Sequence, residues 1–493
     1  MDRVHDGNLT GNGMKGTGNL EDPGQRKAPE QPPPRFASPE HGNCRKVFTT
    51  PRRPRPAPTV APQYLSVPGA CRPIPTPEQQ DAPAMPKKDA PEKHGFDAQR
   101  LQRLDAFLKE RYLDSGKLPN AQILVSRDGE IVHFSSQGPA REGSRTPIDE
   151  GSIFRIASMT KPVTSVAFMM LVEDGKVAID TPVHHVLPEF KDIGVYSGGG
   201  AGVPFVTSPT REPMRMLDLL RHTSGLTYGF QNRSNVDAAY RAGRIEDWHG
   251  GYDLDGFVGE LGKLPLEFSP GEAWNYSVST DVLGAVIQRL SGMPLDRYFE
   301  EKIFAPLKMH DTGFVVPENK ADRLTDCYRW AGPAEGRVML DRAEDSAWRR
   351  PAKLLSGGGG LVSTALDYHR FCLMCANGGE LDGARLLGRK TLELMTLNHL
   401  PGQSDLASLS QSLFSETQNA GIGFGLGFAV TRDVAKAMIP GSAGEYYWGG
   451  MFSTAFFIDP VEKLHAVFMT QTSPSWLHPI RRELKTLIYS SLV

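Results

Sequence analysis

The stretch Ala157-Ser158-Met159-Thr160-Lys161-Pro162-Val163 contains the one Ser-x-x-Lys of this 493-residue sequence. In a helix, residues three apart lie one above the other, so the Ser158 hydroxyl and the Lys161 amine would face the same point. Pro162 places the helix start close to Ser158, because its ring clashes with the carbonyl four residues earlier. The stretch therefore predicts a helix that begins with a hydroxyl beside an amine.

A hydroxyl beside an amine is a nucleophile beside a base. Serine is a weak nucleophile until a neighbour takes its proton, and a lysine amine in apolar surroundings can do so. The apolar run 163–172 would supply those surroundings. A serine at a helix start also points its own N–H into the site, as half of an oxyanion hole. About one Ser-x-x-Lys is expected by chance in a chain this long, so other motifs must support the assignment.

Composition excludes several classes of protein. The net charge of −2 predicts no general attraction to nucleic acid or to an anionic membrane. No run of 18 apolar residues occurs, and residues 1–30 contain no apolar signal core, so we expect no membrane span and a cytoplasmic location. The five cysteines are scattered, which does not fit a disulfide framework.

No metal or cofactor motif stands out. His184-His185 is the nearest candidate, and we interpret it as a loop pair. Gly421-Ile-Gly423-Phe-Gly425-Leu-Gly427 alternates glycine with apolar residues, which predicts a strand with close backbone neighbours rather than a phosphate loop. We therefore expect chemistry that needs no cofactor.

The chain divides into a tail and a folded domain. Residues 1–94 hold 18 of the 39 prolines and show no apolar periodicity, which predicts a disordered, proline-rich tail. Order is expected from Phe96, with Asp97 capping a helix. Residues 95–493 would form one domain, with a sheet subdomain at about 95–165 and 355–493 and a helical subdomain at about 166–354.

The two ends of this domain mirror each other. After the first helix, strands at 122–126 and 130–134 flank Asp128-Gly129, a dipeptide that favours a two-residue turn. Near the end, strands at 455–458 and 465–470 precede a helix that carries Ile480, Leu484 and Ile488. This pattern predicts an α/β (α+β) fold in which both ends build one antiparallel sheet, flanked by the terminal helices. The middle is expected to be mostly helical, with helices at 214–220, 282–290 and 295–304.

Two further stretches have catalytic character. The first, residues 267–278, has a turn at Pro270-Gly271 and then places Tyr276 in an apolar segment. A buried tyrosine alone is usually structural. The second runs from Tyr447 to Ser453 and contains Trp448-Gly449-Gly450, where two glycines allow a ligand to approach the backbone.

Together with Ser158-x-x-Lys161, these stretches resemble the serine β-lactamase and penicillin-binding protein superfamily, most closely the family VIII carboxylesterases, which look like class C β-lactamases. The phrases His222-Thr-Ser-Gly-Leu226 and Gly358-Gly-Gly-Leu-Val-Ser-Thr364 occur in the expected order, and the resemblance covers about 96–493. It implies a β-lactamase/transpeptidase-like fold.

The resemblance also implies roles for residues. Ser158 would be acylated, and Lys161 and Tyr276 would share the proton transfer. Trp448-Gly449-Gly450 would be the third motif of the site. The N–H of Met451 would join that of Ser158 in holding the oxyanion.

Departures from the β-lactamase pattern favour an esterase. Val278 stands where those enzymes keep the asparagine that binds an acylamino group, and Trp448 stands where they keep the lysine that binds the drug's carboxylate. Apolar side chains there disfavour an anionic amide and favour a neutral ester. The sequence has no Gly-x-Ser-x-Gly, which counts against an α/β-hydrolase.

We therefore predict a serine hydrolase that cleaves short-chain carboxylic esters through an acyl-enzyme on Ser158, with weak cephalosporin hydrolysis as a side activity. Which of Lys161 and Tyr276 is the base stays open, because a close pair titrates as a unit. The partner expected is a small-molecule ester, and the sequence does not indicate an oligomeric state. The alternatives are a β-lactamase or D-Ala peptidase, an acyltransferase, and a non-catalytic binding protein on the same fold.

Overall fold

The structure, a computed structural model, describes residues 87–411 and 419–493. Most of the predicted tail, residues 1–86, lies outside this part of the chain. The 3-10 helix η1 (Pro91–His94) is already formed, and the Asp89 N–H donates to the Ile131 carbonyl at 3.0 Å. Regular structure therefore begins before Phe96, earlier than the sequence predicted.

One antiparallel sheet of seven strands organises the domain, in the order β11-β12-β13-β14-β15-β1-β2. Its strands are β1 (Ala121–Arg127), β2 (Glu130–Gln137), β11 (Ile422–Phe424), β12 (Ala429–Thr431), β13 (Tyr446–Gly449), β14 (Ala455–Asp459) and β15 (Leu464–Met469). β1 pairs with β15 in a register that sets Leu124 opposite Val467. Both ends of the domain thus build one sheet, which confirms the predicted fold class.

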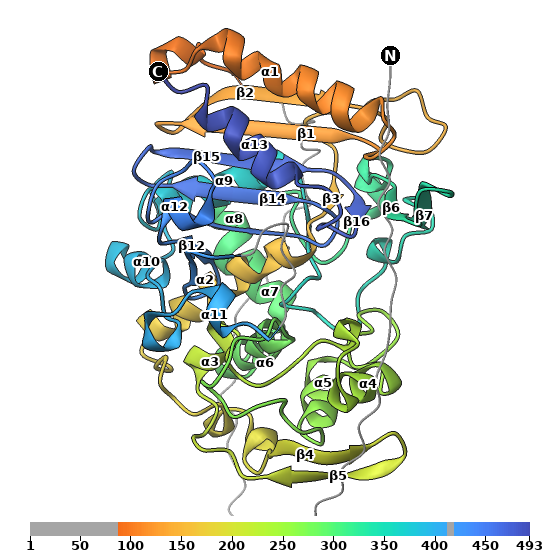
Figure 1. The fold of residues 1–493 in the computed structure, drawn as a ribbon, viewed down its shortest axis with the longest axis vertical. Helices are drawn as coiled ribbons and strands as arrows, with labels where there is room; N and C mark the ends of the chain where they lie inside the picture. The colour runs from red at the N-terminus through yellow and green to blue at the C-terminus, as the bar shows by residue number, and fades with distance from the viewer. Residues whose placement is uncertain (1–86, 412–418) are drawn as a thin grey trace, which may run out of the picture. The chain divides into compact units, whose positions relative to one another are not determined.

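The sequence explains both faces of this sheet. Side chains alternate along a strand, so Ile123 and Val125 pack with α1 (Ala98–Leu108) and α13 (Ile480–Tyr489), while Leu124 joins the main core on the other face. Figure 1 shows α1 and α13 beside β1, β2 and β15. The turn between β1 and β2 has positive φ at Asp128 and Gly129, as predicted.

Helix caps also follow the sequence. The Asp97 side chain accepts from the Arg100 N–H at 3.0 Å and caps α1. Thr364 caps α9 (Ala365–Ala376), which packs on the other face of the sheet with α2 (Thr160–Glu173). The predicted strand in the glycine run 421–427 is present over Ile422–Phe424 as β11, and the backbone of Met395 crowds Gly425 just after it.

The middle of the chain is less purely helical than predicted. The expected helices are present, but two hairpins stand among them: β4 (Val195–Gly200) with β5 (Val203–Ser208), and β6 (Cys327–Trp330) with β7 (Arg337–Asp341). Further helices are α3 (Met216–Leu220), α4 (Asn235–Ala242), α5 (Leu254–Leu261), α6 (Ser279–Ser291), α7 (Leu295–Phe299), α8 (Ala305–Leu307), α10 (Arg389–Met395), α11 (Leu406–Leu409) and α12 (Val434–Ala437). Short strands are β3 (Phe154–Arg155), β8 (Val362–Ser363), β9 (Glu380–Leu381), β10 (Ala384–Arg385) and β16 (Thr472–Ser473).

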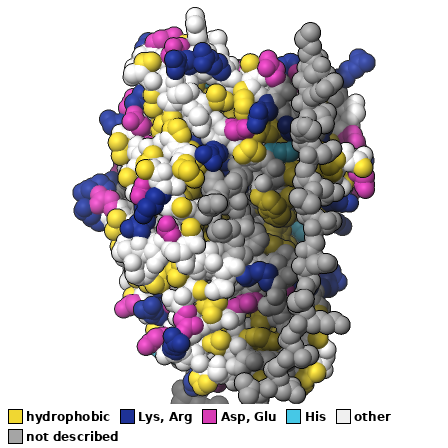
Figure 2. All heavy atoms as spheres, in the orientation of Figure 1, with side chains coloured by type: hydrophobic (Ala, Val, Ile, Leu, Met, Phe, Trp, Pro, Cys, Tyr) yellow, Lys and Arg dark blue, Asp and Glu magenta, His cyan; other side chains and the backbone are white. Residues whose placement is uncertain are grey.

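Figure 2 shows basic and acidic side chains interspersed over one face, as the small net charge suggests. Among the described residues, none of the helices combines the length and the apolar character needed to cross a bilayer.

Candidate active site

Ser158 lies where β3 leads into α2. It belongs to the 3-10 turn η3 (Ala157–Met159), and α2 follows at Thr160, so the predicted helix start is confirmed. Ala157 adopts φ 44°, a left-handed conformation that is rare for a residue with a side chain. The Thr160 hydroxyl donates to the Ala157 carbonyl at 2.7 Å and helps to hold this turn. Strained backbone at such a place is typical of functional sites.

The Lys161 amine lies inside the protein, with 2% of the residue exposed. Its Nζ lies 3.3 Å from the Ser158 Oγ, 3.0 Å from the Tyr228 hydroxyl and 2.7 Å from the Gly358 carbonyl oxygen. The structure therefore brings the predicted nucleophile and its predicted base together, and adds a phenol and a carbonyl that the sequence did not predict.

Tyr228 links the lysine to a buried acid. Its hydroxyl donates to the Asp281 Oδ2 at 3.5 Å, and the Asp281 Oδ1 accepts from the Ser356 hydroxyl at 2.5 Å and the Gly358 N–H at 3.0 Å. Burial and the Asp281 charge raise the pKa of Tyr228 well above its usual range. Burial also raises the pKa of Asp281, although Lys161 opposes this shift. Tyr228 is therefore a neutral phenol that accepts from Lys161.

Tyr276 approaches Lys161 with its ring face. The Lys161 Nζ lies 4.5 Å from the ring centroid, and the Trp448 Nε1 donates to the Tyr276 hydroxyl at 3.4 Å. The neutral ring of His222 packs against Tyr276, with centroids 4.9 Å apart. Burial, and secondarily the charge of Lys161, lower the pKa of His222 well below its usual range. Ser158, Lys161, Tyr276 and Trp448 thus form one cluster.

Trp448-Gly449-Gly450, the third motif, lies at the end of β13 and packs against the turn that carries Ser158. A side chain on Gly450 would meet the Ile156 carbonyl at 2.4 Å, and one on Gly449 would meet the Arg481 guanidinium at 2.6 Å. The Arg481 NH2 donates to the carbonyls of Gly450 at 2.7 Å and Thr454 at 3.0 Å. Only glycine permits both approaches, which bring the turn after Gly450 close to η3.

Two N–H groups border this junction. Within residues 87–411 and 419–493, the N–H groups of Ser158 and Met451 donate to no protein acceptor. Unpaired N–H groups beside a nucleophile are what an oxyanion hole requires. The oxyanion role of these two N–H groups stays a prediction.

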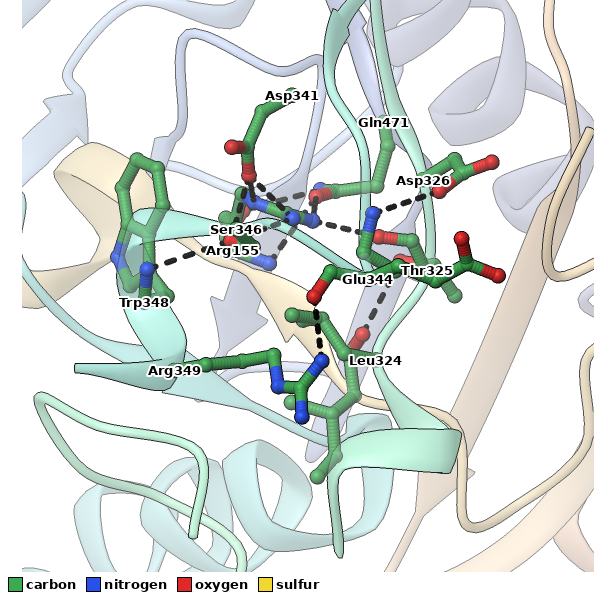
Figure 3. A network of polar contacts seen from close by, with 12 residues as sticks. Arg155, Leu324, Thr325, Asp326, Asp341, Glu344, Ser346, Trp348, Arg349 and Gln471 are labelled. Carbon is green, nitrogen blue, oxygen red and sulfur yellow. Dashed lines mark hydrogen bonds and ion pairs between the residues drawn. The ribbon is translucent and has the colours of Figure 1, made fainter. Parts of the chain in front are cut away.

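A second buried cation lies three residues before Ser158. Figure 3 shows Arg155 surrounded by polar groups from distant segments. Its Nε donates to the Asp341 Oδ2 at 2.7 Å, its NH1 to the Thr325 carbonyl at 2.6 Å, and its NH2 to the Ser346 hydroxyl at 3.0 Å. The guanidinium also lies 5.3 Å from the ring of Trp348. Arg155 therefore fixes the 341–348 wall relative to the nucleophile turn.

The pocket in front of Ser158 is mostly aromatic. Its lining includes Tyr228, Phe230, Trp248, Trp274, Tyr276, Trp348, Trp448, Gly449, Gly450, Met451 and Phe452. Its charged lining residues are two acids, Glu246 and Asp341, and three bases, Arg481, Arg482 and Lys485. Apolar walls with a few polar groups suit a small organic substrate.

Sequence reasoning missed four members of this site: Tyr228, Asp281, Arg155 and Glu246. Tyr228 follows the His222-Thr-Ser-Gly-Leu226 phrase by two residues, and Asp281 is an acid on the apolar side of α6. Asp281 could have been found from the sequence, because an acid on a buried helix face needs a partner. Tyr228 could have been found from its place just after that phrase. Arg155 and Glu246 carry no comparable local signal.

Comparison with known proteins identifies the group to which the chain belongs. The family described as Beta-lactamase matches residues 102–489. Esterase EstB from Burkholderia gladioli is 32% identical over 406 residues, covering 79% of this chain and 95% of the esterase. An uncharacterized protein of Mycobacterium tuberculosis is 33% identical over 364 residues, covering 73% of this chain and 88% of that protein.

The fold has solved counterparts. EstCE1, described as a hydrolase with promiscuous acyltransferase activity, superimposes with a TM-score of 0.65 at 24% identity, covering 79% of this chain and 99% of that chain. Fold and relatives define a hydrolase on the serine hydrolase scaffold. The chain belongs to the beta-lactamase family, and the predicted resemblance to its family VIII esterases is confirmed.

Proposed function

We propose that the protein is a carboxylesterase that cleaves short-chain esters through an acyl-enzyme on Ser158. The observation that carries the proposal is the buried Lys161 amine, 3.3 Å from the Ser158 hydroxyl and held by two further partners. The esterase name of a relative at 32% identity supports the substrate class.

The hydrogen bonds around Lys161 favour the lysine as the base. The Gly358 carbonyl can only accept, and the Tyr228 hydroxyl donates to Asp281, so it also accepts from the amine. A neutral amine that donates to both keeps its lone pair for the third neighbour, the Ser158 hydroxyl. Lys161 would therefore take the serine proton directly.

The reaction then proceeds in two halves. The Ser158 oxygen bonds to the ester carbonyl carbon, the carbon–oxygen bond to the alcohol breaks, and the alcohol leaves with the proton taken from serine. The resemblance assigns Tyr276 a share in this proton transfer, whereas in the structure Tyr276 turns its ring face toward Lys161 and its hydroxyl accepts from the Trp448 Nε1. Water then attacks the acyl-enzyme and releases the acid. The N–H groups of Ser158 and Met451 would hold the oxyanion in both halves.

The pocket opposes a β-lactam substrate. Trp448 lies against Tyr276 where a cation would bind the drug's carboxylate, and Val278 is buried and offers no amide. A chromogenic cephalosporin should accordingly be hydrolysed with a lower kcat/KM than p-nitrophenyl butyrate.

The direct test is intact mass spectrometry after rapid mixing with p-nitrophenyl esters of several chain lengths. The wild type should gain the mass of each acyl group, and Ser158→Ala should gain none. Added alcohols that capture the acyl group in preference to water would indicate an acyltransferase instead. Absence of any adduct, together with esterase activity that survives in Ser158→Ala, would overturn the proposal.

A further inference from the structure

Glu246 is a half-buried carboxylate inside an aromatic pocket. One of its oxygens accepts from the N–H of Gly229, the residue that follows Tyr228. Its side chain lines the same pocket as Ser158. It therefore lies on the Tyr228 side of the substrate space, and the proposed reaction does not use it.

The charges around Glu246 do not balance. Arg241, on the preceding helix, is paired at 2.8 Å with the fully buried Asp237, and Lys161 is held by Ser158, Tyr228 and Gly358. Asp281 adds a second negative charge behind Tyr228. In the part of the chain that the structure describes, Glu246 forms no ion pair. Glu246 is therefore a carboxylate without a directly paired cation.

This imbalance is unfavourable without a ligand. Burial, opposed mainly by the Gly229 N–H, raises the pKa of Glu246 to about 7. A buried carboxylate becomes stable once a cation pairs with it in the same low-dielectric space. Lys161 and Arg241 oppose this shift from a distance, but among the described residues no cation forms an ion pair with Glu246, so a cationic group of the substrate would be its first direct partner.

The walls of the pocket suit a cation as well. Trp248 and Trp348 lie with ring centroids 5.9 Å apart, and Phe230 stacks on Tyr228 at 4.8 Å. Aromatic faces around an acid attract ammonium groups through their electron-rich faces. The same carboxylate and ring faces would repel an anionic substrate.

We propose that Glu246 is a specificity-determining residue that makes the pocket select esters carrying an ammonium group, protonated or quaternary, over neutral esters of the same shape. This inference rests on the proposed esterase function. It assigns a substrate class to that site.

The test uses two butyrate esters that differ in one atom. Butyrylcholine carries a quaternary nitrogen, and 3,3-dimethylbutyl butyrate carries carbon in its place. The wild type should favour the cationic ester by about 10-fold in kcat/KM, the expected size for one cation–π and carboxylate contact. Glu246→Gln should bring the ratio close to one. Glu267→Gln is the matched control, since Glu267 is a half-buried glutamate bonded to Ser234 outside the pocket lining, and it should leave the ratio unchanged.

A second measurement keeps the inference testable if Glu246→Gln does not fold. Choline should inhibit wild-type hydrolysis of p-nitrophenyl butyrate more strongly than 3,3-dimethylbutanol does. If the wild type hydrolyses the neutral ester and its ratio of kcat/KM values, cationic ester to neutral ester, is one or less, the inference is wrong and the proposed function stands. The same holds if Glu246→Gln leaves the wild-type ratio unchanged. Failure to hydrolyse p-nitrophenyl butyrate and both test esters would overturn the proposed function, and the inference with it.

Discussion

Two buried basic side chains flank the nucleophile, Arg155 three residues before it and Lys161 three residues after it, and their surroundings differ. Arg155 is fully buried and meets a carboxylate, a carbonyl and a hydroxyl, so its charge is matched. Lys161 meets a hydroxyl, a phenol and a carbonyl, and among the described residues no carboxylate lies within ion-pair distance of it. A matched cation is a fixed structural element, whereas an amine on neutral partners is suited to give and take a proton.

The largest effect expected is on the chemistry of Lys161. Lys161→Met should lower kcat/KM for p-nitrophenyl butyrate by ~10³-fold or more, because Ser158 loses its base. Urea unfolding should change by only about 1 kcal/mol, since methionine fills a similar apolar volume. Lys161→Arg is the control: it keeps the charge, but a guanidinium cannot act as a base. An active Lys161→Arg would mean that charge alone matters at this position.

The reverse pattern is expected at Arg155. Arg155→Met removes the cation of the half-buried Asp341 and leaves the buried Thr325 carbonyl without its donor, and should cost about 3 kcal/mol of unfolding free energy. Urea or thermal unfolding would measure this loss, and Arg155→Lys should lose less because it retains the charge. If the unfolding free energy of Arg155→Met lies within about 1 kcal/mol of the wild-type value, the contrast between Arg155 and Lys161 does not hold.

A pair of neutral bases elsewhere extends the comparison. His369 on α9 and His465 on β15 meet at 2.7 Å between ring nitrogens, and burial lowers the pKa of both, that of His369 from 6.5 to about 4. The unfolded chain takes up protons below pH 6.5 and the folded protein does not, so stability is lost as pH falls from about 6.5 toward 4. His369 alone should account for about 2 kcal/mol between pH 7 and 5.

Unfolding in urea at several pH values measures this slope. His369→Gln cannot take up a proton and should flatten the profile. A variant with the wild-type slope would assign the acid sensitivity to other groups.

The smallest effect expected concerns the phenol beside Lys161. Tyr228→Phe removes the group that accepts from the amine and donates to Asp281, and should lower kcat by ~10–100-fold with KM unchanged. Tyr276→Phe is the informative companion variant, because its phenol lies next to Trp448 instead. If only Tyr276→Phe lowers kcat, the proton passes through Tyr276 without help from Tyr228.

The sequence predicts those parts of the structure that local chemistry decides. Asp128-Gly129 fixes a turn, Asp97 fixes a helix start, and alternating apolar residues fix the faces of β1. The family motifs likewise find Ser158 and Lys161, which lie within one helical turn.

The missed features depend on contacts across long separations. Tyr228 meets Lys161 over 67 residues of sequence, and Arg155 meets Thr325 over 170. Neither has a local pattern that names its partner. The β4–β5 hairpin is missed for another reason: it is glycine-rich and largely exposed, so no apolar alternation marks its strands.

Arg481 and the two glycines of β13 have a consequence for how this scaffold can diversify. The helix α13 holds the Gly450 turn from behind, on the side of the strand opposite Trp448, while the pocket loops around 228–248 and 337–348 shape the front. The support behind the Gly450 turn and much of the pocket wall therefore come from separate parts of the chain, although Tyr228 belongs both to the wall and to the reaction site. Pocket-wall residues that do not contact Lys161 can change while the contact of Arg481 with the Gly450 carbonyl stays in place, so one reaction mechanism can serve many different esters.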